Sequence, residues 1–176
     1  GGGTSYTKAH QPFVKNINDT TIAFLGYTNL ISPSVGSKAA SPAIAYFDID
    51  QTVADVKEAR KKSDLVIVSL HWGNEYETTQ NLNQEKIARA LIDAGAQLII
   101  GHHPHVVQPV AEYGGGYIAY SLGNFVFDQN FSPDTKTGLV LRVTLKDKSI
   151  ISVEQLKLVF TSSYQPYLIS GKNGSK

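Results

Sequence analysis

The sequence predicts an α/β fold in which a parallel βαβ segment is followed by antiparallel strands. Between residues 21 and 100, apolar runs of strand length alternate with amphipathic runs of helical period. Beyond residue 105, strand-like segments follow one another with turn signals and without an intervening helical pattern. These two observations favour one domain over residues 1–169, followed by a frayed polar tail at residues 170–176.

The first half of the parallel segment has clear local signals. Residues 21–28 read as a strand, which the Pro/Gly/Ser-rich loop 29–42 closes. Residues 51–63 predict a helix with Asp50 or Thr52 as its cap. The apolar face of this helix consists of Val53, Val56 and Ala59.

The second half repeats the pattern. Residues 64–70 and 97–100 are short apolar runs, as expected for strands buried on both faces. Residues 84–94 between them predict a helix that Gly95 ends. Its apolar stripe consists of Ile87, Ala88, Leu91 and Ile92. This order implies parallel strands joined by right-handed crossovers.

The remaining strands are expected at residues 106–110, 117–122, 139–145 and 150–160. Residues 114–116 and 146–148 are the clear turns between them. Residues 139–145 alternate in polarity, which predicts one face in water. Residues 1–20 are polar and turn-rich and show no firm period.

The composition excludes several classes of function. A net charge of +1 argues against an electrostatic nucleic-acid binder, so no nucleic-acid partner is expected. The absence of cysteine excludes disulfides, zinc–thiolate sites and a cysteine nucleophile. No apolar run approaches 18 residues, so a membrane connection would need a segment outside this sequence. The chain does not begin with methionine, and we expect it to be part of something longer.

Four of the five histidines follow the ends of two apolar runs. His71 follows the first, and His102, His103 and His105 follow the second. Because the carboxyl ends of neighbouring parallel strands meet at one sheet edge, these imidazoles can converge. His103 and His105 share a side in an extended segment, so with His71 they are the expected metal ligands. His102 would face away, as a catalytic or a structural histidine.

Other polar and aromatic residues are candidates for the same edge. Glu75 is a metal ligand, a general base or an ordinary loop carboxylate. Trp72 lines a substrate pocket or packs in the core. Asn124, with Asp128 nearby, bonds a ligand or a histidine or belongs to an ordinary turn. His10 stands alone and is expected at the surface.

Three segments resemble the CapA-type family, which is linked to bacterial capsule and poly-gamma-glutamate biosynthesis. They are SLHWGNEY at residues 69–76, GAQLIIGHHPHVVQP at residues 95–109 and IAYSLGNFVF at residues 118–127. The resemblance extends from about residue 21 to about residue 166. This family is in turn similar to the calcineurin-like metallophosphatases.

The resemblance implies a four-layer α/β/β/α sandwich with a metal-dependent hydrolase site at the strand ends. By matching motif, His71 takes the place of the lone histidine ligand, and His103 and His105 take that of the Gly-His-x-His pair. The implied cofactors are divalent metal ions, two in the complete domain, with Mn, Fe and Zn all open. The family's Gly-Asp and Asn-Asn-His segments are absent from this sequence.

The resemblance therefore implies the C-terminal portion of a larger domain. Its N-terminal half, or another copy of the chain, would cover apolar surface and strand edges that this portion exposes. The implied function is metal-dependent hydrolysis of a phosphoester or an anionic polymer at the bacterial cell surface, by a membrane-anchored or exported parent protein. The alternative is a non-catalytic component of a capsule assembly or export complex.

Overall fold

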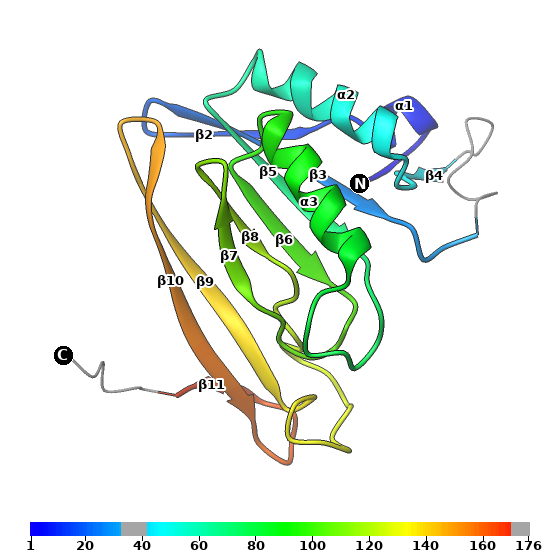
Figure 1. The fold of residues 1–176 in the computed structure, drawn as a ribbon, viewed down its shortest axis with the longest axis vertical. Coiled ribbons are helices and arrows are strands. Elements are labelled where there is room, and N and C mark those ends of the chain that lie inside the picture. Colours follow the sequence, from blue (N-terminus) through cyan, green and yellow to red (C-terminus); the bar gives the residue numbers. More distant parts are fainter. Residues whose placement is uncertain (33–41, 170–176) are drawn as a thin grey trace.

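A six-stranded mixed sheet forms the centre of the structure, a computed structural model that describes residues 1–32 and 42–169. Its strand order is β2-β3-β5-β6-β8-β7 (Figure 1). The four inner strands are parallel, whereas β2 and β7 pair antiparallel at the two edges. The strands are β2 (Phe13–Ile17), β3 (Thr20–Thr28), β5 (Leu65–His71), β6 (Leu98–His102), β7 (Val110–Tyr113) and β8 (Gly116–Ala119).

Helix α2 (Ile49–Arg60) packs beside this sheet (Figure 1). Its N-cap is Asp48, the residue just before the helix. The backbone of Asp48 is extended, and its side chain accepts a hydrogen bond from the amide of Gln51 at 2.9 Å. The predicted caps, Asp50 and Thr52, are therefore wrong, because both lie inside the helix. Thr52 is instead fully buried.

Helix α3 (Leu82–Asp93) has the stripe that the sequence predicts. Asn81 and Gln84 form a reciprocal capping box at its start, and Gly95, with a φ of +115°, follows its end. The predicted stripe residues Ile87, Ala88, Leu91 and Ile92 are all buried. They share one core with Val56 of α2 and with the strand residues Val66, Val68 and Ile99.

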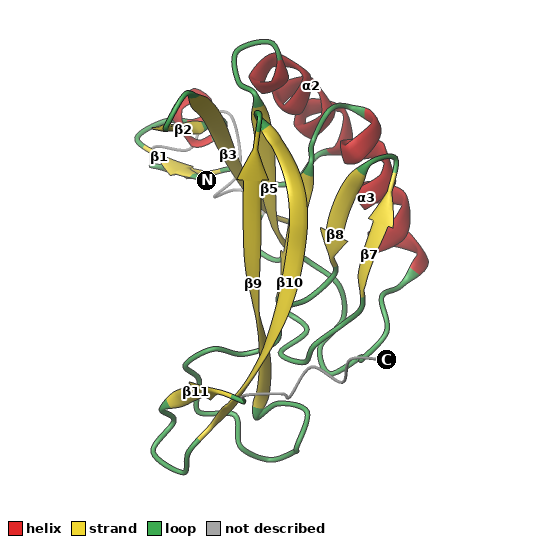
Figure 2. Ribbon diagram, turned by 90° about the vertical axis from the view of Figure 1, so that its left-hand side faces the viewer, coloured by secondary structure: helices red, strands yellow, loops and turns green. Residues whose placement is uncertain are grey.

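A second sheet in the order β11-β10-β9 completes the described fold. It consists of β9 (Thr137–Lys146), β10 (Ser149–Phe160) and β11 (Pro166–Leu168), all antiparallel. The β9–β10 hairpin runs along the central sheet on the side away from α2 and α3 (Figure 2). Its turn contacts Asp64 through Lys148, and its base is bonded to Leu122 through the amide of Leu139.

These elements confirm the predicted fold class, a parallel βαβ segment followed by antiparallel strands. The described residues supply three layers: helices, the central sheet and the second sheet. None of the helices in this part of the chain has the length and apolar character that crossing a membrane requires.

One predicted strand does not form among the described residues. Residues 106–110 do not form a strand: β7 begins only at Val110, and Val107 makes a single bridge to Leu122. Pro109 lies within this segment and cannot donate to a strand ladder. Residues 1–20 contain short elements that showed no period, namely β1 (Gly2–Gly3), α1 (Tyr6–Ala9) and β2, with β1 pairing to β4 (Ala43–Ile44). The predicted tail at residues 170–176 and most of the loop 29–42 lie outside the described residues.

Candidate metal centre at the carboxyl edge of the sheet

The two histidine segments meet at one edge of the central sheet. β5 ends at His71 and β6 ends at His102, and these two residues are partners in the parallel register. The loops beyond them are joined by two backbone hydrogen bonds, from Trp72 to the carbonyl of His102 at 3.0 Å and from Tyr76 to that of Pro104 at 2.8 Å. The edge is therefore a connected pair of loops at the carboxyl ends of parallel strands, where α/β sheets build their sites.

His103 and His105 come together through a turn and not through an extended segment. Their φ angles are +103° and +61°, so the premise of two extended residues was wrong. Their ring centroids nevertheless lie 5.9 Å apart. Positive φ costs a residue with a side chain about 1–2 kcal/mol. Two such residues around Pro104 indicate local strain, of the kind that concentrates at functional sites.

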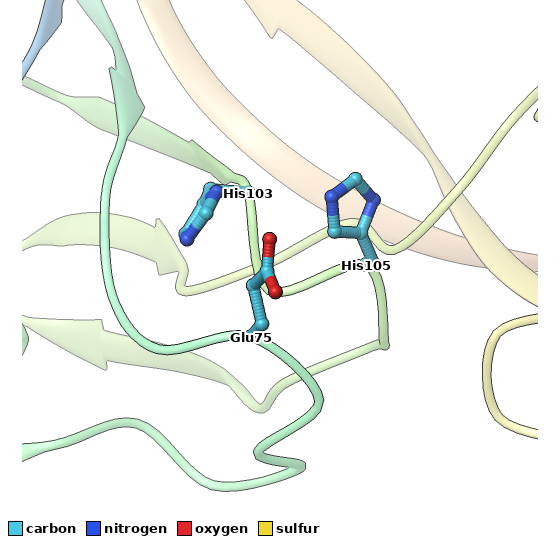
Figure 3. A group of neighbouring side chains, drawn as sticks. All are labelled: Glu75, His103 and His105. Carbon is cyan, nitrogen blue, oxygen red and sulfur yellow. The ribbon is translucent and has the colours of Figure 1, made fainter. Parts of the chain in front are cut away.

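Glu75, His103 and His105 form a group of possible metal donors. One donor atom from each lies within 4.8 Å of the others, and the carboxylate of Glu75 lies between the two imidazoles (Figure 3). Around a tetrahedral zinc ion with bonds of about 2.0–2.1 Å, donor atoms are about 3.3 Å apart. The donor atoms are thus up to about 1.5 Å farther apart than around a bound zinc ion. Two nitrogens and a carboxylate suit several first-row divalent ions.

Asn124 fixes the tautomer of His105. The Nδ2 of Asn124 donates to the carbonyl of Thr135 at 3.0 Å, so its Oδ1 is the atom that faces Nδ1 of His105 at 2.9 Å. An amide oxygen only accepts, and therefore Nδ1 of His105 carries the proton. Nε2 of neutral His105 then has its lone pair free for a metal. Asn124, a predicted contact of a ligand or a histidine, is 6% exposed and is bonded to His105 in the structure.

His71 lies outside the group of Glu75, His103 and His105, and its ring contacts that of His103. Its ring centroid is 4.9 Å from that of His103, and its Nδ1 is 3.2 Å from the hydroxyl of Thr28. The structure thus brings the three predicted ligands into a row, with His103 in the middle, whereas the three-donor group contains Glu75 in place of His71.

The electrostatics of this edge favour neutral imidazoles. Burial lowers the pKa of His71 and, more weakly, so does the neighbouring charge of His105. Burial also lowers the pKa of His102 and of His103, followed in each case by the effect of His71. Because a neutral imidazole is the form that binds a metal or accepts a proton, these shifts suit both tasks.

Trp72, which was predicted to line a substrate pocket or pack in the core, lies in the core of the described structure. It is 3% exposed, its Nε1 donates to the carbonyl of Tyr120 at 3.0 Å, and its ring stacks on Tyr120. Gly101 leaves room for this contact, because a Cβ there would lie 1.9 Å from the same carbonyl oxygen. Asp128, another sequence candidate, is exposed in the loop that follows Asn124.

Other residues were missed or misplaced by the sequence patterns. His10 was expected at the surface, but it is 7% exposed and its Nδ1 lies 2.8 Å from Asp55. Tyr27 donates to the same carboxylate at 2.9 Å. At the candidate metal centre, the aromatic rings of Tyr76 and Phe127 pack against His105. Only tertiary contact reveals these roles, because no local period marks them.

The family of this chain follows from a profile match to residues 1–129, described as "Bacterial capsule synthesis protein PGA_cap". The match includes the whole candidate metal centre. The chain belongs to this bacterial capsule synthesis family. The family that the sequence motifs resembled is thereby confirmed.

Two curated relatives agree with this assignment. The chain is 40% identical over 141 residues to the PGA biosynthesis protein CapA of Bacillus subtilis, covering 80% of this chain and 37% of that protein. It is 35% identical over 162 residues to the capsule biosynthesis protein CapA of Bacillus anthracis, covering 90% of this chain and 39% of that protein. The chain thus spans about two fifths of the length of either relative.

Solved structures share the fold. A 5′-nucleotidase-like protein of Staphylococcus aureus superposes with a TM-score of 0.55 at 16% identity, covering 87% of this chain and 30% of that chain. The sulfate thiohydrolase SoxB of Thermus thermophilus superposes with a TM-score of 0.53 at 16% identity, covering 82% of this chain and 24% of that chain. At this identity the likeness concerns the fold alone, which is metallophosphatase-like.

Proposed function

We propose that the chain contributes a divalent-metal site to a metallophosphatase-like hydrolase that acts on a phosphoester or an anionic polymer during capsule synthesis. The observation that carries this proposal is the group of Glu75, His103 and His105, whose donor atoms lie within 4.8 Å of one another. Its position at the carboxyl edge of a parallel sheet, in a fold shared with metallophosphatase-like proteins, supports the same reaction class.

Each residue of the edge has a task in this proposal. His103 and His105 bind the metal through neutral imidazole nitrogens, and Glu75 adds a negatively charged oxygen. When bound, the metal polarises the scissile group and lowers the pKa of a coordinated water. His71 extends the site beyond His103. His102, whose pKa is lowered by burial, is the candidate proton acceptor beside His71.

The proposal places this chain as the C-terminal portion of a larger metallophosphatase-like domain. The support is that the chain spans about two fifths of either relative's length and that its sequence lacks the Gly-Asp and Asn-Asn-His segments expected in the N-terminal half. The remaining ligands, including those for a second metal ion, would come from the rest of that domain. A cell-surface role follows the two capsule biosynthesis relatives, and an exported or membrane-anchored parent protein is part of the proposal.

Native mass spectrometry of the purified chain with added Mn²⁺ tests the site. We expect a bound ion in the wild-type chain and none in His103→Ala. Glu77→Gln is the matched control, because Glu77 is an exposed carboxylate in the same loop and lies outside the donor group. Equal metal occupancy in the wild-type chain and in His103→Ala would show that His103 does not bind the metal.

Hydrolysis of p-nitrophenyl phosphate by the full-length parent protein tests the reaction. We expect turnover that depends on Mn²⁺ and is lost in His103→Ala. A parent protein that binds metal yet hydrolyses no phosphoester would favour the alternative, a non-catalytic component of a capsule assembly complex.

A further inference from the structure

Three exposed aromatic side chains lie beside His105, two of them against its ring and the third against Tyr76. The ring of Phe127 lies 5.0 Å and that of Tyr76 6.1 Å from the ring of His105, measured between centroids. Phe131 meets Tyr76 edge-on at 5.2 Å. Their exposed fractions are 40% for Phe127, 43% for Tyr76 and 65% for Phe131. We call Tyr76, Phe127 and Phe131 the aromatic rim.

Single exposed apolar residues are ordinary, but this rim is continuous. Tyr76 joins Phe131 to His105, and Phe127 contacts His105 independently. His105 belongs at the same time to the possible metal-donor group. The aromatic rim is therefore adjacent to the candidate metal centre. Its exposed apolar ring faces can contact part of a ligand that is bound at this centre.

Polar but uncharged groups lie beside the aromatic rim. Gln129 donates through Nε2 to the hydroxyl oxygen of Tyr76 at 3.0 Å, which leaves the hydroxyl proton of Tyr76 to donate. The three rim residues and Gln129 carry no positive charge, so they offer nothing that selects a polyanion. Aromatic faces beside a hydroxyl and an amide instead suit a ring with an apolar face and polar substituents.

We infer that the aromatic rim is a subsite for a ring-bearing group of the substrate, carried next to the phosphate that the donor group would hold. This inference rests on the proposed function and narrows its substrate class to phosphoesters of a six-membered ring. The ring has two chemical sources, a sugar or an aryl group, which share the apolar face that the rim binds.

Calorimetric titration of the Mn²⁺-saturated full-length parent protein with three phosphonates tests the inference, since phosphonates are not hydrolysed. Methylphosphonate has no ring, phenylphosphonate has an aryl ring and glucosyl C-phosphonate has a sugar ring. Stacking on aromatic side chains contributes about 0.5–1.5 kcal/mol, so we expect a ring-bearing probe to bind about 2- to 12-fold more tightly than methylphosphonate. The better of the two ring probes identifies the source of the ring.

Two variants test whether the aromatic rim causes the tighter binding of the ring-bearing probes. Phe131→Ala and Phe127→Ala should remove the advantage of the ring while leaving the affinity for methylphosphonate unchanged. Phe125→Ala is the matched control, because Phe125 is 59% exposed in the same loop and lies outside the rim. It should behave like the wild-type chain.

The outcomes separate the inference from the proposed function. If methylphosphonate binds but neither ring probe binds more tightly, the rim is not a subsite and the metal site stands. If an advantage of the ring survives both rim variants, the subsite lies elsewhere and the inference is wrong. If none of the phosphonates binds in the presence of Mn²⁺, the phosphoester function itself is overturned, and the rim loses its role with it.

Discussion

The side-chain amide of Asn124 determines which nitrogen of His105 can bind a metal. Because Nδ2 of Asn124 is committed to the carbonyl of Thr135, its Oδ1 must accept the proton on Nδ1 of His105. The remaining nitrogen, Nε2, is left with a lone pair. Histidine ligands in metalloproteins are commonly oriented by such a partner on the other ring nitrogen. Asn124 is thus a positioning residue, buried behind the group that it serves.

The first prediction follows from this bond. Asn124→Ala should lower the affinity for Mn²⁺ by about 10- to 100-fold, because His105 loses both its orientation and its fixed tautomer. Calorimetric titration with Mn²⁺ measures the change. Gln129→Ala is the control, since it removes a neighbour of the Asn124 amide without touching the bond to His105. Unchanged affinity in Asn124→Ala would show that His105 does not need this partner.

Much of the carboxyl edge of the central sheet could be predicted, because its strands follow from apolar runs that are local in the sequence. The apolar runs that end at His71 and His102 are strands, and their parallel pairing places both histidines at one edge. The conformation of residues 103–105 was not predictable in this way. His103 and His105 adopt positive φ, which tertiary bonds such as that from Tyr76 to Pro104 support and no local period announces.

The second prediction concerns Glu75. Glu75→Gln should weaken Mn²⁺ binding by at least about tenfold, because it removes the only negatively charged oxygen of the donor group. Glu77→Gln, two residues along the same loop, should leave the affinity within about twofold of the wild-type value, since Glu77 lies outside the group. Similar losses in both variants would point to the general charge of the loop and not to coordination by Glu75.

The sequence also could not show whether individual polar and aromatic side chains are buried or exposed. Trp72 and His10 are both residue types that occur in sites and in cores, and each has an apolar body with a polar tip. In the structure Trp72 donates to Tyr120 in the core, and His10 pairs with Asp55 of α2. Both partners are more than 40 residues away along the chain, so only the folded topology brings them within reach.

The third prediction is a pH dependence at Asp64. The amide of Thr21, at 2.8 Å, and then Lys148 hold the pKa of this carboxyl below its usual value of 3.8. A carboxyl whose pKa is lowered on folding stabilises the protein above the unfolded pKa, and the contribution is lost as the pH falls through the folded value. Asp64→Asn should therefore unfold at lower urea concentration than the wild-type chain at pH 7.

The difference between Asp64→Asn and the wild-type chain should shrink once the pH falls below about 4, where the carboxyl begins to protonate in the unfolded state. Urea unfolding at a series of pH values measures it. Asp19→Asn, an exposed residue of the β2–β3 turn, is the control and should show no such trend. A difference that stays constant down to pH 3 would mean that Asp64 acts through packing and not through its charge.

The last prediction concerns the glycine that precedes the histidines. A Cβ at Gly101 would lie 1.9 Å from the carbonyl oxygen of Tyr120 and 2.5 Å from Nε1 of Trp72, and thus inside the hydrogen bond between these residues. Backbone atoms cannot move aside as a flexible side chain can, so Gly101→Ala should cost at least about 3 kcal/mol of unfolding free energy. Gly2→Ala, which meets nothing within 4 Å, should change it by less than about 0.5 kcal/mol. Urea unfolding compares the two variants. A small loss in Gly101→Ala would mean that β6 and the backbone at Tyr120 can separate at this point, and that the close approach at Gly101 is not needed for stability.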